Sequence, residues 1–448
     1  MKPSSFLRPG LFVAGLALLA STAVAGPWEP LFNGKDLSGW KVINGSAPYT
    51  VIDGTIVGTT VANSPNSFLA TEKSFGDFIF ECEVRQEGSS NSGIQFRGLS
   101  TAEYMNGRVH GYQMEIDASE RAWTGGIYDE ARRGWLYPVT LNPDARSSYQ
   151  LGRWNHVRIE AIGTSIRTWI NGIPVSHVID DMTASGFIAL QIHSIGRNEE
   201  PGRRVFWRNL RIQTTDLKPA PADDLFVRNV MANTVSDIEK ARGWRLLWDG
   251  KSTDGWRSVR GDAFPEKGWT VENGVLSVLA GVKGGSIVSK EEFSAFELQL
   301  EFQLSEAANS GIKYFVQPGS ELGFEYQLLD DAKHPDAKQG AAGNRTLASL
   351  YDLLPREGTL RGLNIQPRVG EWQHARIVAR PNGDVEHWLN GIKVVSYNRK
   401  SAALAAMIAR SKYVSNAGFG TPEKSGIVLQ DHNDLVKFRS IKIRPLAE

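Results

Sequence analysis

The chain repeats its own sequence once, in the same order, and this repeat limits the folds that are open to it. LFNGKDLSGW (31–40) returns as LWDGKSTDGW (247–256), and GRWNHVRIEA (152–161) returns as GEWQHARIVA (370–379). Further segments match in the same order at nearly the same spacing. A long unit that recurs in this way is a duplicated domain, and 448 residues are enough for two of them.

The repeat divides the chain into four segments. Residues 1–25 have a basic start, an apolar centre and a small-residue cleavage site, the pattern of a secretory signal peptide. The first domain then covers 26–213, a Pro-rich linker covers 214–243 and the second domain covers 244–448. Because the apolar centre is too short to span a membrane, we expect cleavage after Ala25 and a periplasmic or secreted protein.

Short alternating segments predict β-strands throughout both copies. Phe78, Phe80 and Cys82 occupy every second position of one such segment, so they share one side of a strand. The Asn-Gly pairs at 171–172 and 390–391 each lie between two apolar runs, which is typical of type I′ hairpins. We therefore predict an all-β fold of two tandem jelly-roll β-sandwich domains.

Composition excludes several kinds of function. The formal net charge is +1, without a long run of one sign, so nothing indicates binding to nucleic acid or to an anionic membrane. Cys82 is the only cysteine, which excludes an intrachain disulfide and a cysteine metal site. The 13 tryptophans suit binding to sugar faces, although core packing uses tryptophan equally well.

Polar residues share one face of the predicted strands in the first copy. In GYQMEIDA, Gln113, Glu115 and Asp117 alternate with apolar residues and therefore point the same way. Gln191 and His193 share a face for the same reason. Polar groups on an open sheet face, with aromatic loops around them, are typical of a sugar site.

The second copy keeps part of this pattern. Gln430 and His432 have the same spacing as Gln191 and His193, but Gln327 replaces Glu115. The two histidines are candidates for a base, since imidazole changes protonation near neutral pH. Histidines that only bond a loop carbonyl remain the structural alternative.

The loop after the acidic strand of the second copy holds a possible metal site. Asp330, Asp331 and His334 lie close together in LDDAKHPD, and carboxylate and imidazole groups bind divalent ions. A hydrated acidic loop without a metal is the alternative interpretation.

Tyr128-Asp129 in the first copy corresponds to Tyr351-Asp352 in the second.

The stretch EIDASE (115–120) raises the question of a conventional glycosidase. A retaining glucanase needs two carboxyls about 5 Å apart, for which Glu115 and Glu120 are the candidates. Strict alternation places Glu120 on the opposite face of the strand unless a bulge intervenes. The stretch is also confined to one copy, since Gln327 cannot serve as a nucleophile.

A resemblance to a known family covers nearly the whole chain after the expected signal peptide. LFNGKDLSGW, NSGIQFRG, GYQMEID, WINGIPV and GFIALQIHS together resemble the bacterial 3-keto-disaccharide hydrolase family. The second copy is similar to it through LWDGKSTDGW, NSGIKYFV, EWQHARI and HWLNG. The resemblance implies a concanavalin A-like sandwich, export, and activity on glycosides already oxidised at C3. One departure is Arg97, because Phe315 stands in the aligned place of the second copy.

The chemistry of such a substrate requires no carboxylate nucleophile. A C3 ketone acidifies the C2 proton, so a base can form an enolate that expels the C1 aglycone before water adds. His193 or Asp117 is the candidate base of the first copy, and Arg97, Arg132 or a metal the candidate enolate stabiliser. In the second copy the corresponding candidates are His432, Asp330 and His334.

The complete set of predicted site residues follows from these arguments. The catalytic candidates are Glu115, Asp117, His193, Asp330 and His432. The candidates for substrate binding are Arg97, Gln113, Tyr128, Asp129, Arg132, Gln191, Gln327, Arg345, Tyr351, Asp352 and Gln430. The candidate metal ligands are Asp330, Asp331 and His334.

We therefore expect an exported hydrolase of 3-keto-disaccharides or 3-keto-glucosides. The sequence indicates no cofactor other than the candidate divalent metal ion. Its partner would be a separate glycoside 3-oxidase that supplies the oxidised substrate. Two alternatives remain open at this point: a noncatalytic carbohydrate-binding module of lectin type, and a retaining glucanase. The fold alone does not choose among them.

Overall fold

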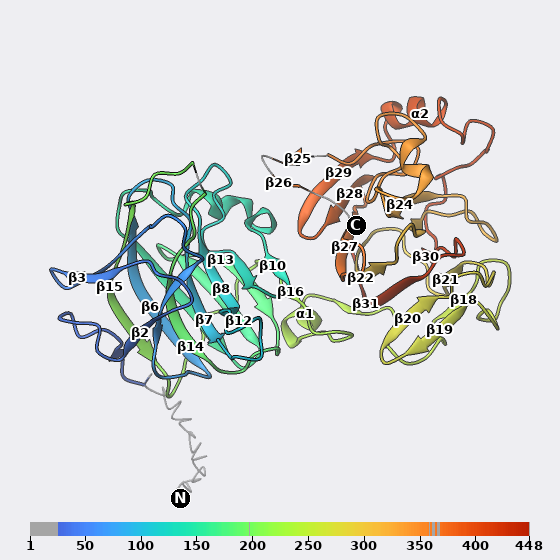
Figure 1. Cartoon of the computed structure of the whole chain (residues 1–448). Coiled ribbons are helices and arrows are strands. Elements are labelled where there is room, and N and C mark those ends of the chain that lie inside the picture. Colours follow the sequence, from blue (N-terminus) through green and yellow to red (C-terminus); the bar gives the residue numbers. More distant parts are fainter. Residues whose placement is uncertain (1–25, 197, 358, 361–362, 365–367, 448) are drawn as a thin grey trace, which may run out of the picture.

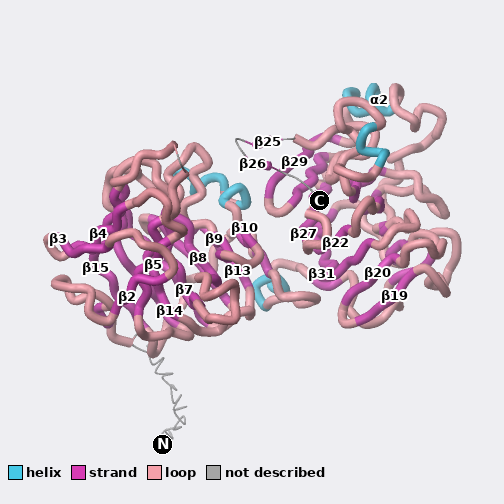
Figure 2. The backbone as a smooth tube through the Cα atoms, in the orientation of Figure 1, coloured by secondary structure: helices cyan, strands magenta, loops and turns pink. Residues whose placement is uncertain are grey.

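Two lobes made almost entirely of strands follow one another along the chain (Figures 1 and 2). The computed structural model describes residues 26–196, 198–357, 359–360, 363–364 and 368–447. The expected signal peptide, 1–25, lies outside the described residues. Each lobe consists of two packed sheets, which are antiparallel apart from one short strand of the linker, so the prediction of two tandem jelly-roll sandwiches is confirmed.

The first sandwich uses residues up to Gln213 and one strand of the linker. One sheet has the order β16-β13-β12-β11-β6-β15-β4-β3, with β1 beside β15, and the other has the order β10-β9-β8-β7-β14-β5-β2. The strands of the former are β1 (Glu29–Pro30), β3 (Tyr49–Ile52), β4 (Thr55–Thr59), β6 (Phe78–Gln86), β11 (Asn155–Ile162), β12 (Ser165–Ile170), β13 (Ile173–Ile179), β15 (Arg204–Gln213) and β16 (Arg228–Asn229). Those of the latter are β2 (Trp40–Ile43), β5 (Ser67–Thr71), β7 (Ser92–Leu99), β8 (His110–Ile116), β9 (Ile127–Glu130), β10 (Gly134–Tyr137) and β14 (Phe187–Ile192). The 3₁₀ turns η1 (Val139–Leu141) and η2 (Pro143–Ser147) follow β10.

The second sandwich repeats this arrangement. One sheet has the order β19-β20-β31-β22-β27-β28-β29, with β17 beside β31, and the other has the order β18-β21-β30-β23-β24. The strands of the former are β17 (Arg245–Leu246), β19 (Trp269–Glu272), β20 (Val275–Val278), β22 (Phe296–Leu304), β27 (Gln373–Ala379), β28 (Asp384–Leu389), β29 (Ile392–Asn398) and β31 (Val436–Pro445). Those of the latter are β18 (Trp256–Ser258), β21 (Ile287–Ser289), β23 (Asn309–Tyr314), β24 (Phe324–Leu329) and β30 (Val428–Leu429). A hairpin of β25 (Thr359–Leu360) and β26 (Leu363–Asn364), the turn η3 (Pro335–Lys338) and the helix α2 (Ala402–Ile408) lie in its connections.

Strand order shows that the two copies are equivalent in space. The run β8-β7-β14-β5-β2 of the first sandwich corresponds to β24-β23-β30-β21-β18 of the second. The copies differ beside the hairpin that β7 and β8 form in the first copy and β23 and β24 form in the second. There the first copy has β9 and β10, whereas the second has a long connection that touches β24 through the isolated bridge Tyr326–Leu350.

Alternation along the strands decides which side chains enter the core between the two sheets. On β8, Tyr112, Met114 and Ile116 are fully buried in the apolar core. Gln113 and Glu115 lie between them in sequence and point to the other face of the sheet, as the alternation predicts. The polar face of this sheet is therefore free to form a site.

Glycines open that face at equivalent points of both copies. A Cβ atom added at Gly93 would lie 2.5 Å from the Gln113 side chain, and one added at Gly311 would lie 2.2 Å from the Glu325 side chain. Such distances are too short for real contacts, so each glycine makes room for a polar side chain on the neighbouring strand. The need for space beside this side chain thus explains the glycine of the NSGI motif, which both copies contain.

The Asn-Gly pairs adopt the predicted hairpin geometry. Asn171 and Gly172 have φ angles of 51° and 80°, and Asn390 and Gly391 have φ angles of 50° and 81°. Both central residues of a type I′ turn need positive φ, which Asn and Gly tolerate best. The turns connect β12 to β13 and β28 to β29.

The linker packs against both sandwiches. Its strand β16 pairs in parallel with β13, and its helix α1 (Asp237–Ala241) begins with a capping box of Ser236 and Glu239. The Glu239 carboxylate also accepts a hydrogen bond from Lys442 Nζ at 2.8 Å. Arg228 of β16 donates to Glu301 of β22 at 3.2 Å. The connection is thus held by polar contacts to each side.

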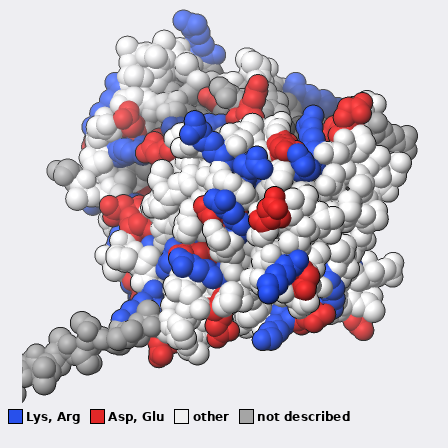
Figure 3. Space-filling model, turned by 90° about the vertical axis from the view of Figure 1, so that its left-hand side faces the viewer, with Lys and Arg blue, Asp and Glu red and all other residues white. Residues whose placement is uncertain are grey.

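The surface shows no gathering of one charge on the side that Figure 3 displays, where basic and acidic side chains are interspersed. This agrees with the net charge of +1. Among the described residues, no helix is both long enough and apolar enough to cross a membrane.

Candidate functional site

A pocket of about 690 Å³ lies over the polar face of the sheet in the first sandwich, and we call it the first pocket. Its floor consists of Gln113 and Glu115 from β8 with Tyr128 and Glu130 from β9. His193, the residue directly after β14, enters from the side. Trp135 of β10 and the loop residues Asn66, Asn91, Arg108 and Arg121 complete the wall.

Glu115 is the central acid of the first pocket. Its side chain is nearly buried, and this burial raises the pKa of its carboxyl to about 7. The side-chain amides of Asn91 and Gln113 donate to it, the latter at 3.1 Å, and Arg121 lies 3.8 Å away. These contacts favour the charged form but do not outweigh burial. A carboxyl with a pKa near 7 can both donate and accept a proton at physiological pH.

His193 presents a basic nitrogen to the same pocket. Its Nδ1 lies 2.6 Å from the backbone oxygen of Ser194. Since a carbonyl oxygen only accepts hydrogen bonds, Nδ1 carries the proton and Nε2 of the neutral ring keeps a lone pair. Glu130 is close enough to interact electrostatically with this ring, and burial raises the pKa of the Glu130 carboxyl above its ordinary value.

Several amides beneath the first pocket have no partner. Gln95 and Gln191 are fully buried, yet neither the nitrogen nor the oxygen of either amide is hydrogen-bonded among the described residues. Cross-strand pairing places Gln95 opposite Gln113 and Gln191 opposite Gly93, so both lie on the pocket side. Buried amides are normally paired, so these two amides are an exception that lies directly beneath the pocket.

Arg121 and the rings of Trp135 and Tyr128 line the first pocket, and the buried ring of Trp123 packs against Trp135. The Trp135 ring lies 4.7 Å from that of Trp123 and 5.2 Å from that of Tyr128. Arg121 lies over the Trp135 ring at 5.1 Å and donates to Asp117 Oδ2 at 2.7 Å. Asp117 therefore orients Arg121 rather than lining the pocket itself. Although burial acts to raise it, hydrogen bonds from Ser119 and Arg121 bring the pKa of Asp117 below its ordinary value.

The second sandwich has a pocket of about 700 Å³ over the equivalent face, which we call the second pocket. Glu325 and Gln327 of β24, Lys313 of β23 and Gln430 after β30 line it. Lys313 Nζ lies 3.5 Å from the Glu325 carboxylate. Burial nevertheless raises the pKa of Glu325.

The acid has changed place between the two pockets. Glu115 and Gln327 are equivalent, because each pairs with the glycine of its NSGI motif. Gln113 and Glu325 are equivalent in the same way, since they pair with Gln95 and Lys313. The first pocket thus has an acid, Glu115, where the second has an amide, and the second has an acid, Glu325, paired with a lysine. The two pockets are not chemically interchangeable.

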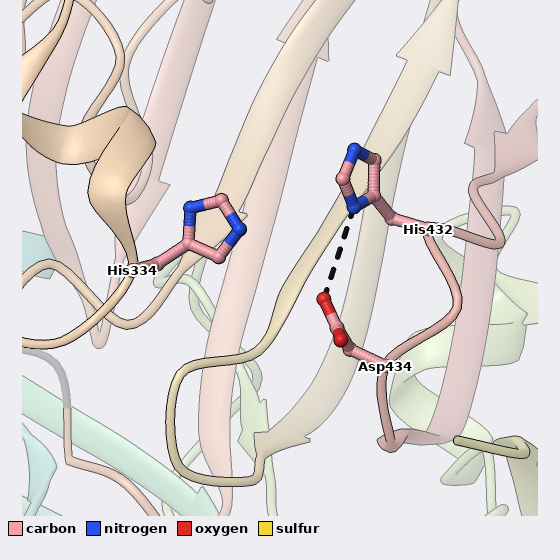
Figure 4. Close-up of side chains that lie close together, drawn as sticks. All are labelled: His334, His432 and Asp434. Carbon is pink, nitrogen blue, oxygen red and sulfur yellow. Dashed lines mark ion pairs between the residues drawn. The ribbon is translucent and has the colours of Figure 1, made fainter. Parts of the chain in front are cut away.

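A group with the residue types of a metal site lies at the rim of the second pocket. His334, His432 and Asp434 bring one possible ligand atom each to within 4.8 Å of one another. Figure 4 shows the two rings and the carboxylate turned toward a common space, with His432 Nδ1 and Asp434 Oδ2 3.8 Å apart. Imidazole and carboxylate groups in this number suit a transition metal.

The structure brings some of the predicted residues of the first copy together. Gln113, Glu115, Tyr128 and His193 line the first pocket, and Gln191 lies beneath it.

Other predicted residues of the first copy lie elsewhere. Arg97 is buried, at a φ of 45°, and donates to the backbone oxygens of Gly76 and Gly163 at 2.9 Å. It therefore ties loops together, which explains why an apolar Phe315 can replace it among core aromatics. Asp129 alternates with the pocket residues of β9, and its carboxylate accepts from Arg132 at 2.8 Å outside the pocket.

The second copy shows the same division. Gln327, His334, Tyr351, Gln430 and His432 line the second pocket.

Its remaining candidates build the surrounding loops. Arg345 donates to Asp352 at 2.7 Å, and neither lines the pocket. Asp330 accepts from the backbone N–H of Ala307 at 2.8 Å, and Asp331 accepts from that of Leu347 at 2.7 Å. Asp331 also accepts from Arg356 at 2.6 Å. Because their oxygens are engaged in this way, Asp330 and Asp331 do not form a possible metal site with His334. The possible metal site that contains His334 consists of His334, His432 and Asp434.

Sequence reasoning missed Glu130, Arg121, Glu325, Lys313 and Asp434. Alternation contained a signal for Glu130, because Tyr128 and Glu130 share a face of β9 while Asp129 cannot. The same rule, applied to β23 and β24, selects Lys313 and Glu325. Arg121 and Asp434 lie in loops, where no periodicity identifies them.

Comparison with known proteins identifies a family and a relative that the chain resembles. A family model described as a 3-keto-alpha-glucoside-1,2-lyase-like domain matches residues 27–213 and 243–444. A 3-keto-disaccharide hydrolase of Bacteroides thetaiotaomicron is 32% identical over 238 residues, which cover 46% of this chain and 79% of that protein.

Solved structures are also among the proteins to which parts of the chain are similar. A protein of Parabacteroides distasonis described as a glycosyl hydrolase has 29% identity and a TM-score of 0.43, covering 48% of this chain and 100% of that one. A carbohydrate-binding module of Bacillus subtilis has 18% identity and a TM-score of 0.27, covering 39% of this chain and 95% of that one. Because the family model matches both copies and most of the chain, the protein belongs to the family of the 3-keto-alpha-glucoside-1,2-lyase-like domain.

Proposed function

We propose that the protein cleaves glycosides whose sugar ring already carries a ketone at C3. The observation that carries the proposal is the pairing, in one pocket, of a carboxyl with a pKa of about 7 and an imidazole nitrogen with a lone pair. An elimination next to a ketone needs one group of each kind. The family and the name of the Bacteroides relative support the same substrate class.

The first step is removal of the C2 proton. His193 Nε2 is the base of this step, because His193 lines the pocket and its Nδ1 is hydrogen-bonded to the backbone oxygen of Ser194. The negative charge moves to the C3 oxygen, where the Arg121 guanidinium, held in place by Asp117, stabilises the enolate. Glu130 stabilises the imidazolium that forms.

The second step breaks the C1–O bond. The enolate reforms the C3 ketone with a C1–C2 double bond, and the protonated Glu115 carboxyl gives its proton to the departing oxygen. Water then adds at C1, where the Glu115 carboxylate takes a proton from it and the His193 imidazolium returns a proton to C2. The sum is hydrolysis of the glycoside, and both groups end in their starting states.

A conventional retaining mechanism finds less support. Glu120 is exposed in the loop after β8 and is not part of the pocket lining. Glu120 therefore does not complete a nucleophile and acid pair with Glu115, and Asp117, which is bound to Arg121, is not part of the pocket lining.

The decisive experiment compares a 3-keto-glucoside with its parent glucoside, in both anomers and with the same aglycone. We expect the purified full chain to release aglycone only from the keto substrate, and Glu115→Gln and His193→Gln to release it more slowly than the wild type does. Release from the parent glucoside would instead indicate a conventional glycosidase. Binding of either sugar without turnover would indicate a carbohydrate-binding module.

The proposal includes a partner and a location. Because this chemistry starts from a ketone, a separate glycoside 3-oxidase must oxidise the sugar first. The signal pattern of residues 1–25 supports export. Mass spectrometry of protein collected from outside the cytoplasm should find a chain that begins at Gly26, whereas an intact N-terminus would contradict export.

A further inference from the structure

We propose that the second pocket binds one divalent transition-metal ion through His334, His432 and Asp434. Their ligand atoms lie within 4.8 Å of one another, and the three side chains face a common space (Figure 4). Ligand atoms around a metal with bonds of about 2.0–2.2 Å stand about 3–4 Å apart, so side-chain movements below about 1 Å close the set.

The loop that supplies His432 and Asp434 is held in place before any ion binds. Asp431 accepts hydrogen bonds from the backbone N–H groups of Gly284 and Gly285 at 2.9 and 2.8 Å. Asp434 Oδ2 accepts from the backbone N–H of Asn309 at 3.0 Å. The carboxylate and the imidazole are thus aimed by contacts to the sheet, which lowers the cost of forming a metal site.

The loop that supplies His334 is equally constrained. The backbone N–H of His334 donates to the backbone oxygen of Asp330 at 2.9 Å, and the Asp330 carboxylate caps Ala307. The backbone N–H of Asp336 donates to His334 Nδ1 at 3.2 Å, so Nε2 carries the proton of the neutral ring. An ion bound at Nε2 displaces this proton, and Nδ1 then carries the ring proton in place of the hydrogen bond from Asp336.

The ligand types select the class of ion. Two imidazoles and one carboxylate favour zinc, cobalt, nickel or iron over calcium and magnesium, which prefer oxygen ligands. His432 and Asp434 are partly exposed, with 48% and 34% of their side chains accessible, so water or substrate can reach the ion. Three protein ligands leave open positions, as in catalytic rather than structural metal sites.

The open positions face a pocket with unpartnered oxygens. Gln327 Oε1 and Gln430 Oε1 line the second pocket and have no hydrogen-bond partner among the described residues. A sugar oxidised at C3 offers a ketone oxygen beside a hydroxyl oxygen, a pair that chelates a metal while its hydroxyl protons bond these amides. This choice of ligand rests on the proposed function, whereas binding of the ion itself does not.

The first pocket provides a comparison for the proposed metal site, because it keeps one of the three ligands and not the others. His193 is the equivalent of His432, but Ile195 stands where the second copy has Asp434, and the first copy has no counterpart of the loop with His334. The metal site is therefore expected in the second copy alone.

Cobalt titration of the tag-free, chelator-treated full chain tests the proposal. We expect one Co²⁺ per chain by calorimetry, with a visible cobalt absorption band. His432→Gln and Asp434→Asn should each weaken binding at least tenfold, whereas the matched variant His193→Gln should bind as the wild type does. Circular dichroism of each variant checks that the sandwich remains folded.

Absence of stoichiometric binding, or equal loss of binding in His193→Gln, would overturn the metal site. In a second arm, a 3-keto-glucoside should shift the cobalt band and the parent glucoside should not. An unshifted band would overturn the assigned ligand but leave the metal site standing. Failure of the proposed function is seen separately, as absent turnover of keto substrates by the untreated protein.

Discussion

Burial of a single carboxyl decides much of the chemistry in the first pocket. Glu115 has two amide donors and a nearby arginine, which together favour its charged form. Removal from water favours the neutral form more strongly, so its pKa lies near 7. The second copy avoids this situation by placing the amide of Gln327 at the same point. The ionisation of Glu115 should therefore be visible in both activity and stability.

The first prediction concerns the pH dependence of turnover. If the protonated Glu115 carboxyl assists the leaving group, kcat on a 3-keto-glucoside falls as pH rises through about 7. Glu115→Gln should lower kcat by about 100-fold or more and remove this limb of the profile. Steady-state rates between pH 5 and 9 provide the measurement. A limb that persists in Glu115→Gln would assign it to another group.

The second prediction concerns stability. The folded protein binds a proton at Glu115 more tightly than the unfolded chain does, so wild-type stability is lost as pH rises from the ordinary pKa of 4.5 to about 7. Glu115→Gln carries no such cost and should gain up to about 3 kcal/mol over the wild type above pH 7. Denaturant unfolding at several pH values measures the difference. Parallel wild-type and Glu115→Gln curves would contradict the prediction.

Sequence reasoning was most informative where a side chain lies on a strand. Gln113, Glu115 and Gln327 line the pockets because alternation determines their face. It was least informative in loops, where partners depend on contacts between distant segments. Asp330 and Asp331 could serve as metal ligands by type, but backbone N–H groups engage their oxygens. Asp434, which lies beside His432, could be found only after the fold had brought His334 to it.

At the scale of elements, turns carried the strongest local signal. The Asn-Gly pairs predict two-residue hairpins from sequence alone, and both form with positive φ. The edge strands β9 and β10 were less predictable. In the second copy, a longer connection covers the corresponding side of the hairpin of β23 and β24 instead.

The third prediction compares the two hairpin glycines. At Gly172 an added Cβ meets nothing within 4 Å, so Gly172→Ala should cost only the backbone strain of positive φ, about 1 kcal/mol. At Gly391 the added Cβ would also lie 2.7 Å from Pro138 of the first sandwich. Gly391→Ala should therefore destabilise the protein more than Gly172→Ala does. Denaturant unfolding measures both costs, and equal costs would show that the contact with Pro138 yields freely.

At the scale of the whole molecule, duplication has produced two pockets with different chemistry. The repeat in the sequence predicts two similar sandwiches, and the equivalent strand orders agree with it. The chemical difference between the two pockets was harder to predict from the sequence, because it depends on which position of a cross-strand pair holds the acidic residue. The first pocket offers an acid and an imidazole, and the second offers a lysine–glutamate pair and the His334 cluster.

The last prediction follows from the separation of these pockets. No lining residue is common to the first and second pockets in the described part of the chain, so their contributions to turnover should add. His193→Gln removes the base of the first pocket, and any turnover that remains should disappear on chelation of the metal. His432→Gln removes a metal ligand, and chelation should then have no further effect on the rate. Initial rates of aglycone release from a 3-keto-glucoside, measured for both variants and the double variant with and without chelator, provide the test. If chelation slows His432→Gln, or if His193→Gln alone removes all turnover, the pockets do not act as two independent sites.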